Sequence, residues 1–209
     1  MKKSIHTWGV FLLMLSIIYG CGDKVIITHF ETGEKQEEYQ YTGDSLKHGE
    51  YKRYSQGGIL LEQANYVEGK LNGERIIYNA KGEKEVSEIY ENNELNGPFK
   101  EFHPNGKLKF LGTYTKNVLA GKVNVFYPSG KIKEEVQFAD NVEDGPFKEF
   151  HENGNLKWEG TYRNGDNEFG LLKEYNEKGE LIRKMMCDER AICTTTWTHD
   201  GSHLKNTDS

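Results

Sequence analysis

Proline, cysteine and long apolar stretches are scarce in this 209-residue sequence. It contains 4 prolines and 3 cysteines, and 35% of its residues are hydrophobic. So few prolines argue against a polyproline chain, and the composition is not that of a disordered one. A chain with so little hydrophobic material cannot easily build a thick two-layer core. We therefore expect a thin structure that depends on aromatic side chains, each of which buries roughly 150–250 Å².

The longest apolar run lies at the N-terminus and is too short for a membrane-spanning helix. It covers residues 5–18 after Lys2 and Lys3, whereas a spanning helix needs about 20 apolar residues. This is the length of a secretory signal, and the sequence Ile-Tyr-Gly-Cys that ends at Cys21 resembles a bacterial lipobox. We predict a lipoprotein signal over residues 1–20 and lipidation of Cys21, and hence export and lipid anchoring at the bacterial cell envelope. The alternatives are an uncleaved N-terminal anchor and an ordinary signal peptide that leaves Cys21 as a free or disulfide-bonded thiol.

An excess of positive charge is also lacking. The net charge is −6, and removal of Lys2 and Lys3 with the signal leaves 25 basic against 33 acidic residues, a net charge of −8. Such a chain is unsuited to nucleic acid and to electrostatic docking on anionic lipid. Export makes a nucleic-acid partner less plausible still.

Glycine and aromatic residues are abundant and follow a 24-residue period. The first glycines of successive units are Gly49, Gly73, Gly97, Gly121 and Gly145, with Gly170 after 25 residues. A second glycine follows nine residues later in each unit, at Gly58, Gly82, Gly106, Gly130, Gly154 and Gly179. Aromatic residues recur five and seventeen residues after the first glycine. A fixed period of this size is typical of a stacked repeat architecture.

Each unit is predicted to be a β-hairpin. Its second glycine supplies the positive φ of a tight turn, and an aliphatic residue at position eleven should share a face with the aromatic at position seventeen. We expect both aromatic positions to form ladders along one face. The fold is then all-β, an elongated single-layer antiparallel sheet of tandem 24-residue hairpins. A degenerate repeat over 21–42, a repeat array over 43–187, and a capping strand with a tail over 188–209 complete the predicted organisation.

These units resemble the MORN family, and specifically the bacterial MORN-repeat variant of the YwqK-type antitoxin family. The resemblance rests on an aromatic, an Asn-Gly turn, an aliphatic two residues on and a second aromatic, as in Phe102, Asn105-Gly106, Leu108 and Tyr114. It extends over about residues 25–187. It implies an interaction module, and the family label does not assign an antitoxin activity to each member. An export signal argues against a simple cytoplasmic toxin-neutralising role.

No catalytic, metal-binding or cofactor-binding pattern stands out. His103 and His151 share a register, but two units separate them by about 20 Å, too far to share a metal ion. Glu134 and Glu135 are adjacent on a strand and point to opposite faces, so we interpret them as part of a solvated face. The sequence lacks a Gly-x-Ser-x-Gly elbow, a phosphate-binding glycine loop and a metal-spaced His/Cys cluster. We predict no enzyme activity, no catalytic residues, no metal and no cofactor.

The aromatic row at position seventeen is the candidate binding strip. It consists of Tyr66, Tyr90, Tyr114, Phe138 and Tyr162, with Trp158 beside them. The rings either bind a ligand or only pack the thin sheet together. We predict a non-enzymatic scaffold whose partner is a protein. A periplasmic immunity or antitoxin-like factor of the YwqK type and a cell-wall glycan binder are the alternatives.

The last unit departs from the period. Cys187 occupies the place that an aromatic holds in the five preceding units, and Cys193 follows six residues later in the predicted last strand. We predict a Cys187–Cys193 disulfide that caps the array in an oxidising compartment. Two buried thiols are the alternative.

A closing bridge over so short a loop should stabilise the protein by roughly 2 kcal/mol. Mass spectrometry of the exported protein, alkylated with and without prior reduction, should show Cys187 and Cys193 labelled only after reduction. Two thiols that are labelled without reductant would contradict the bridge.

Overall fold

The computed structural model describes residues 24–43 and 45–202 of the chain. The predicted signal over 1–20 and the lipidation site Cys21 lie outside the described residues. The described part is β-structure without an α-helix.

In the described residues eighteen strands follow one another. Their bounds are β1 Lys24–His29, β2 Lys35–Tyr41, β3 Lys47–Tyr54, β4 Leu60–Val67, β5 Lys70–Leu71, β6 Gly73–Tyr78, β7 Lys84–Glu91, β8 Glu94–Leu95, β9 Gly97–Phe102, β10 Leu108–Thr115, β11 Val118–Leu119, β12 Gly121–Phe126, β13 Ile132–Ala139, β14 Val142–Phe150, β15 Leu156–Tyr162, β16 Gly170–Tyr175, β17 Leu181–Cys187 and β18 Cys193–Thr198.

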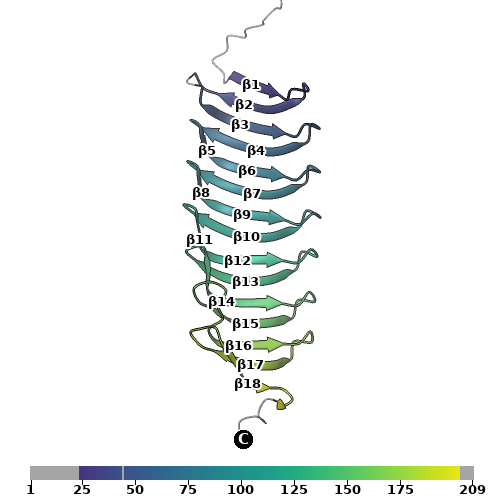
Figure 1. Ribbon diagram of the computed structural model, residues 1–209, viewed down its shortest axis with the longest axis vertical. Coiled ribbons are helices and arrows are strands. Elements are labelled where there is room, and N and C mark those ends of the chain that lie inside the picture. The colour runs from purple at the N-terminus through teal and green to yellow at the C-terminus, as the bar shows by residue number, and fades with distance from the viewer. Residues whose placement is uncertain (1–23, 44, 203–209) are drawn as a thin grey trace, which may run out of the picture.

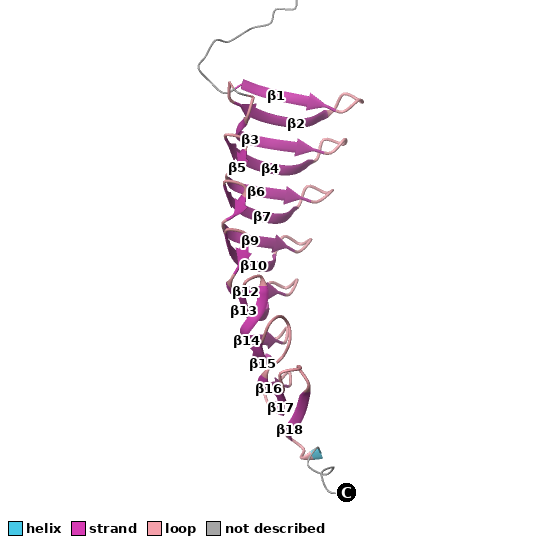
Figure 2. Cartoon of the chain, turned by 60° about the vertical axis from the view of Figure 1, so that its left-hand side comes forward, coloured by secondary structure: helices cyan, strands magenta, loops and turns pink. Residues whose placement is uncertain are grey.

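The strands form one open antiparallel sheet in which each hairpin pairs with the next along the chain. Strand β2 pairs with β3, β4 with β6, β7 with β9, and so on to β17 and β18. Figure 1 shows the hairpin tips along one long edge and the connecting segments along the other. Figure 2 shows that the sheet is a single twisted layer. The predicted fold class, an elongated single-layer antiparallel sheet of tandem hairpins, is confirmed.

The hairpin tips use one turn geometry throughout. In the first full unit Gly58 donates its N–H to the Ser55 carbonyl, and Ser55 donates to the Ile59 carbonyl. Only the glycine has positive φ, +77° at Gly58. This is a type I turn followed by a left-handed residue, a three-residue hairpin loop with a G1 bulge. The second glycine of each period is therefore required by backbone conformation.

The earlier hairpin β1–β2 closes in the same way, although its sequence is degenerate. Gly33 donates to the Phe30 carbonyl and Phe30 donates to the Glu34 carbonyl. By this alignment His29 takes the place of the aromatic at position five. The predicted partial unit before Gly49 is thus a complete hairpin in the structure.

A bulge in the second strand of each hairpin changes the predicted faces. Arg53 pairs with Glu62 and Tyr54 pairs with Leu60, so Leu61 is an extra residue. Directly opposed residues place their side chains on the same face. Position eleven therefore shares a face with the aromatic at position five, and the bulge separates it from position seventeen. The expectation that position eleven and position seventeen share a face was wrong.

The two aromatic positions lie on opposite faces, so the expectation of two ladders on one face was also wrong. The Tyr175 hydroxyl donates to Glu159, which is on the face opposite to the stacked rings of Phe147 and Tyr162. We call the face with positions two, four, thirteen, fifteen and seventeen the core face. The face with positions one, three, fourteen and sixteen is the open face.

The core face holds most of the buried side chains. The largest cluster consists of Leu119, Val123, Val136, Phe147, Leu172 and Cys187. Glycine at position fifteen makes room for it in two units. A Cβ added at Gly112 would lie 2.7 Å from Leu119 Cδ1, and one added at Gly160 would lie 2.8 Å from Leu172 Cδ1. These glycines have ordinary φ values, so close packing explains them.

The connecting turns also join neighbouring units, through hydrogen bonds. In five of them two successive residues have positive φ, as in a type I′ turn; the pairs are Glu68-Gly69, Asn92-Asn93, Lys116-Asn117, Asp140-Asn141 and Asn164-Gly165. Asn117 donates its backbone N–H to the Leu95 carbonyl, and its side-chain oxygen accepts from the Leu95 N–H at 2.8 Å. Asn93 and Asn141 hold Leu71 and Leu119 in the same way. We call this contact the asparagine clamp.

The last hairpin closes with the same backbone hydrogen bonds as the earlier tips, but Ala191, at φ +56°, takes the place of the glycine. Asp188 and Ile192 close a turn between β17 and β18, and Cys187 pairs directly with Cys193, to which it is bonded as a disulfide. Cys187 is buried against the core cluster, at the position of an aromatic in earlier units. The bridge thus lies where the ladder of rings stops.

The asparagine clamp should contribute measurably to stability. Asn117→Ala should lower the free energy of unfolding by about 1–3 kcal/mol, because the Leu95 N–H loses its acceptor and alanine disfavours positive φ. Asn117→Gly should cost less, since glycine tolerates that conformation and Gly69 closes the equivalent turn with its backbone bond alone. Denaturant unfolding of the three proteins measures both effects. Unchanged stability in both variants would show that the clamp does not contribute to stability. Equal losses of stability in the two variants would show that the positive φ at this position does not matter.

Candidate functional site

The six residues of the candidate binding strip all lie on the core face. The five residues at position seventeen come from the second strands of successive hairpins, and Trp158 is at position thirteen of β15. All six are half-buried. Since the described chain forms one layer, no second sheet of it covers these rings. The strip is a continuous row with part of its surface in solvent.

The other side of the row packs on position two of the same hairpins. Tyr66 meets Tyr51 edge-on with ring centres 5.7 Å apart, and Tyr162 stacks on Phe147 at 3.9 Å. Tyr114 meets Phe99 in the same edge-on manner as Tyr66 does Tyr51. Packing and exposure therefore coexist in the same side chains. The choice between packing and binding that the sequence left open is not an exclusive one.

Cationic side chains of the protein lie over rings at the two ends of this row. The Lys47 ammonium lies 4.1 Å from the ring centre of Tyr51, 4.8 Å from that of Tyr39 and 5.5 Å from that of Tyr66. At the other end the Arg183 guanidinium lies 5.5 Å from the Trp158 ring and is paired with Glu174 at 2.7 Å. These are distances at which cation–π attraction operates.

Ion pairs lie beside the rings in the N-terminal part of the core face. Arg75 takes position two of its unit and bonds to Glu62 at 2.7 Å and to Glu88 at 3.0 Å. Arg53 adds a second cation to Glu62 at 3.1 Å. Burial opposes ionisation of Glu62, but the hydrogen bonds and charge of Arg75 and Arg53 outweigh it and lower its pKa. A nearly buried carboxylate is stable here because two cations surround it.

Glu134 occupies the same repeat position as Glu62 but has the opposite environment. It lies directly across from Glu149 in the β13–β14 pair. Burial, and then the charge of Glu149, raise the pKa of Glu134. Like charges directly opposite each other destabilise a sheet. The interpretation of Glu134 as part of a solvated face was wrong, because the bulge and the hairpin register place it half-buried on the core face.

The two carboxylates adjoin the candidate binding strip. Glu149 pairs in register with Trp158. Burial raises the pKa of Tyr162, and the charges of Glu134 and Glu149 raise it further. Lys157 reaches one oxygen of Glu149 at 3.1 Å. The middle of the core face is therefore both aromatic and acidic.

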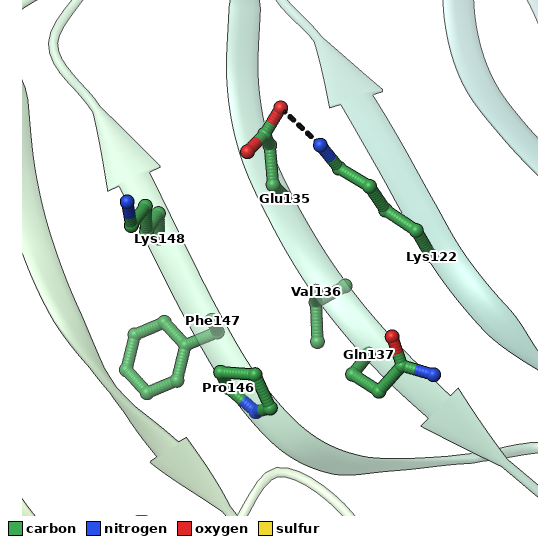
Figure 3. A pocket seen from close by; sticks show the side chains of 7 residues that line it. All are labelled: Lys122, Glu135, Val136, Gln137, Pro146, Phe147 and Lys148. Carbon is green, nitrogen blue, oxygen red and sulfur yellow. Dashed lines mark hydrogen bonds and ion pairs between the residues drawn. The ribbon is translucent and has the colours of Figure 1, made fainter.

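The open face is grooved between hairpins. Figure 3 shows one such shallow groove, whose walls include Pro146 and Lys148 and in which Lys122 points to Glu135 at 2.7 Å. Similar grooves lie between the neighbouring hairpins. None of them contains a residue of the candidate binding strip.

The two histidines join successive hairpin tips. His103 Nε2 lies 2.9 Å from the Phe126 carbonyl, and His151 Nε2 lies 3.0 Å from the Tyr175 carbonyl. A carbonyl only accepts, so each Nε2 carries the proton in this contact. Within residues 24–43 and 45–202 there is no group of three or more His, Cys, Asp or Glu side chains that could hold a metal ion. In the same part of the chain no helix is long and apolar enough to cross a membrane.

Comparison with known families matches the hairpins described above. Four segments of the chain match the model of the MORN repeat variant: residues 47–68, 95–116, 119–140 and 143–164. These four segments are thus similar to the MORN repeat variant. Each matched segment spans the two long strands of one hairpin. No curated protein matches the chain.

The hairpin repeat continues through a stretch that the matched segments do not cover. Hairpin β6–β7 has the same register as its neighbours, including the extra residue after position eleven. Arg75 and Lys84 occupy positions two and eleven, where most units have apolar residues. The backbone repeat is therefore preserved where side-chain identity is not.

The pairing of Glu134 with Glu149 predicts a specific pH dependence. Between the ordinary carboxyl pKa of 4.5 and the raised pKa of Glu134, the folded state holds a proton that the unfolded chain has released. Stability is therefore lost as the pH rises through this window. Glu134→Gln removes the effect, so its stability relative to the wild type should increase as the pH rises above the ordinary carboxyl pKa of 4.5.

Urea unfolding at several pH values measures that difference. Glu135→Gln is the matched control, because this neighbour lies on the open face in an ion pair with Lys122. The control should not gain stability relative to the wild type as the pH rises. A Glu134→Gln difference that does not change with pH would contradict the assignment.

Proposed function

We propose that this protein is a non-enzymatic scaffold that binds a protein partner along its core face. The observation that carries the proposal is the uncovered row of half-buried aromatic side chains over five successive hairpins, from Tyr66 to Tyr162. Aromatic residues are enriched in the buried centres of protein interfaces. A row on one face of a straight array suits an extended partner segment better than a compact small molecule.

The rigidity of the row favours binding. Three of the rings, Tyr66, Tyr114 and Tyr162, already pack against an aromatic residue at position two of the same hairpin. A partner that covers the exposed side of these rings therefore immobilises few additional side chains, and the entropic cost of association is reduced. Binding energy would be distributed over several units, in keeping with the quasi-one-dimensional build of repeat proteins.

We further propose that the scaffold is exported and lipid-anchored at the bacterial cell envelope. The basic and apolar N-terminal stretch that ends at Cys21 supports this address, and the Cys187–Cys193 bridge suits an oxidising compartment. Strand β1 begins at Lys24, three residues after Cys21. Three residues span at most about 11 Å, so the first hairpin would lie next to the membrane surface.

Site-specific photocrosslinking in intact cells tests the scaffold. A benzophenone side chain in place of Tyr114 should capture one protein at high yield, because position seventeen faces the proposed partner. The control carries the same group at Thr113, the exposed neighbour on the open face, and should not capture that protein.

The captured material also separates the alternatives. Capture of a toxin would favour an immunity or antitoxin-like factor of the YwqK type, and capture of wall fragments alone would favour a glycan binder. Equal capture at Tyr114 and Thr113, or no capture by a folded Tyr114 variant, would refute the core face as the binding surface.

A further inference from the structure

The core face has one region where the chain supplies negative charge without a matching cation. Glu134 makes neither a hydrogen bond nor an ion pair with any residue in the described part of the chain, and only burial and more distant charges act on it. Its cross-strand neighbour Glu149 has one ion pair, to Lys157, and its side chain is 28% exposed. Two neighbouring carboxylates thus share one cation.

The same repeat position elsewhere shows what completes such a site. Glu62, at position thirteen of the first full unit, is held by the guanidinium groups of Arg53 and Arg75. Its side chain is 10% exposed, so this carboxylate is almost fully desolvated and fully paired. Guanidinium is the cation that carboxylates bind with fixed two-pronged geometry. Glu134 occupies the equivalent position in its own unit, but no arginine of the described chain pairs with it.

The surroundings of Glu134 suit a guanidinium group in a second, independent way. Phe138 lies four residues further along β13 on the core face, and Trp158 and Tyr162 lie across β14 on β15. The chain's own cations already lie over rings of this face, Lys47 over Tyr51 and Arg183 over Trp158. A cation placed between the carboxylates and the aromatic row would gain both kinds of attraction.

We propose that the middle of the core face, formed by Glu134, Glu149, Phe138 and Tyr162, binds an arginine side chain from an extended segment of the partner protein. The inference rests on the proposed scaffold function and names the chemistry of its partner. The fold has already taken Glu134 partly out of water, so an incoming cation relieves an existing cost. The remaining surface of the row would hold apolar side chains on either side of the arginine.

Other occupants fit the face less well. A metal ion would need more ligands than two carboxylates, and the described residues hold no group of three that could provide them. Anionic lipid headgroups and nucleic acid would be repelled by Glu134 and Glu149. A cationic side chain from a peptide meets the charge, the rings and the open, strand-like shape of the row together.

A pair of peptides tests the proposal on the full chain. The probe is a Thr-Val-Arg-Val-Thr peptide that is acetylated at its N-terminus and amidated at its C-terminus. The control peptide is identical except that citrulline, a neutral isostere, replaces the arginine. Titration followed by NMR should show the arginine peptide shifting the Trp158 and Tyr162 side-chain signals. The citrulline peptide should bind about tenfold more weakly or not at all.

Two matched variants locate the effect. Glu134→Gln should weaken the arginine peptide about tenfold and leave the citrulline peptide unchanged. Glu135→Gln removes the same charge from the open face and should leave both affinities unchanged. Thermal unfolding of each variant confirms that it is folded.

Three results would overturn the proposal: equal affinity for the two peptides, equal effects of the two variants, or no binding of the arginine peptide at millimolar concentration. These failures differ from failure of the scaffold function. If the crosslinker at Tyr114 captures a partner, and Glu134→Gln does not change the yield of that capture, the scaffold function stands and the arginine site is refuted. If the arginine peptide binds but no partner is captured at Tyr114, the arginine site stands and the scaffold function is refuted.

Discussion

Each hairpin of this sheet can bury its apolar side chains only against the hairpins before and after it, because the described chain forms one layer. The rest of the structure follows from that constraint. Rings at position seventeen lean on position two, as Tyr162 does on Phe147. Glycine at position fifteen, as at Gly160, lets the neighbouring side chains come close enough to cover one another. Stability is therefore a sum of contacts between nearest neighbours.

The same constraint explains why polar contacts between units are so regular. A thin sheet leaves both long edges in water, where hydrophobic burial cannot align one hairpin with the next. The asparagine clamps perform that alignment at the connecting edge, and His103 and His151 perform it at the tips. At the C-terminal end, where no further hairpin follows in the described chain, the Cys187–Cys193 bridge takes the place of a neighbour.

The core face is chemically divided along its length. Its N-terminal part combines the ion pairs of Arg53, Glu62 and Arg75 with the rings of Tyr51 and Tyr66, and its later part consists mainly of aromatic and aliphatic side chains. Glu134 is a carboxylate at the same repeat position as Glu62, but it lies in the later part of the face, among aromatic and aliphatic side chains. That mismatch is the feature we connect with a partner, because the chain itself satisfies the equivalent group at Glu62.

Much of the fold could be predicted from the period alone. Glycine is the residue that adopts positive φ most freely, so Gly58 and its equivalents indicate a turn wherever they occur. The faces could not be predicted beyond the bulge, because the extra residue Leu61 reverses the count of alternation and leaves no separate mark in the sequence. The clamp at Asn117 was visible only as a repeated asparagine, whose bond partner lies 22 residues away.

The sequence by itself determined the hairpin repeat, its turns and the place where the period ends at Cys187, since these depend on local backbone conformation and spacing. Only the tertiary structure decided which side chains share a face and which charges meet. Burial and charge pairing depend on the register between hairpins, and one extra residue in a strand is enough to place Glu134 beside Glu149 and the aromatic row.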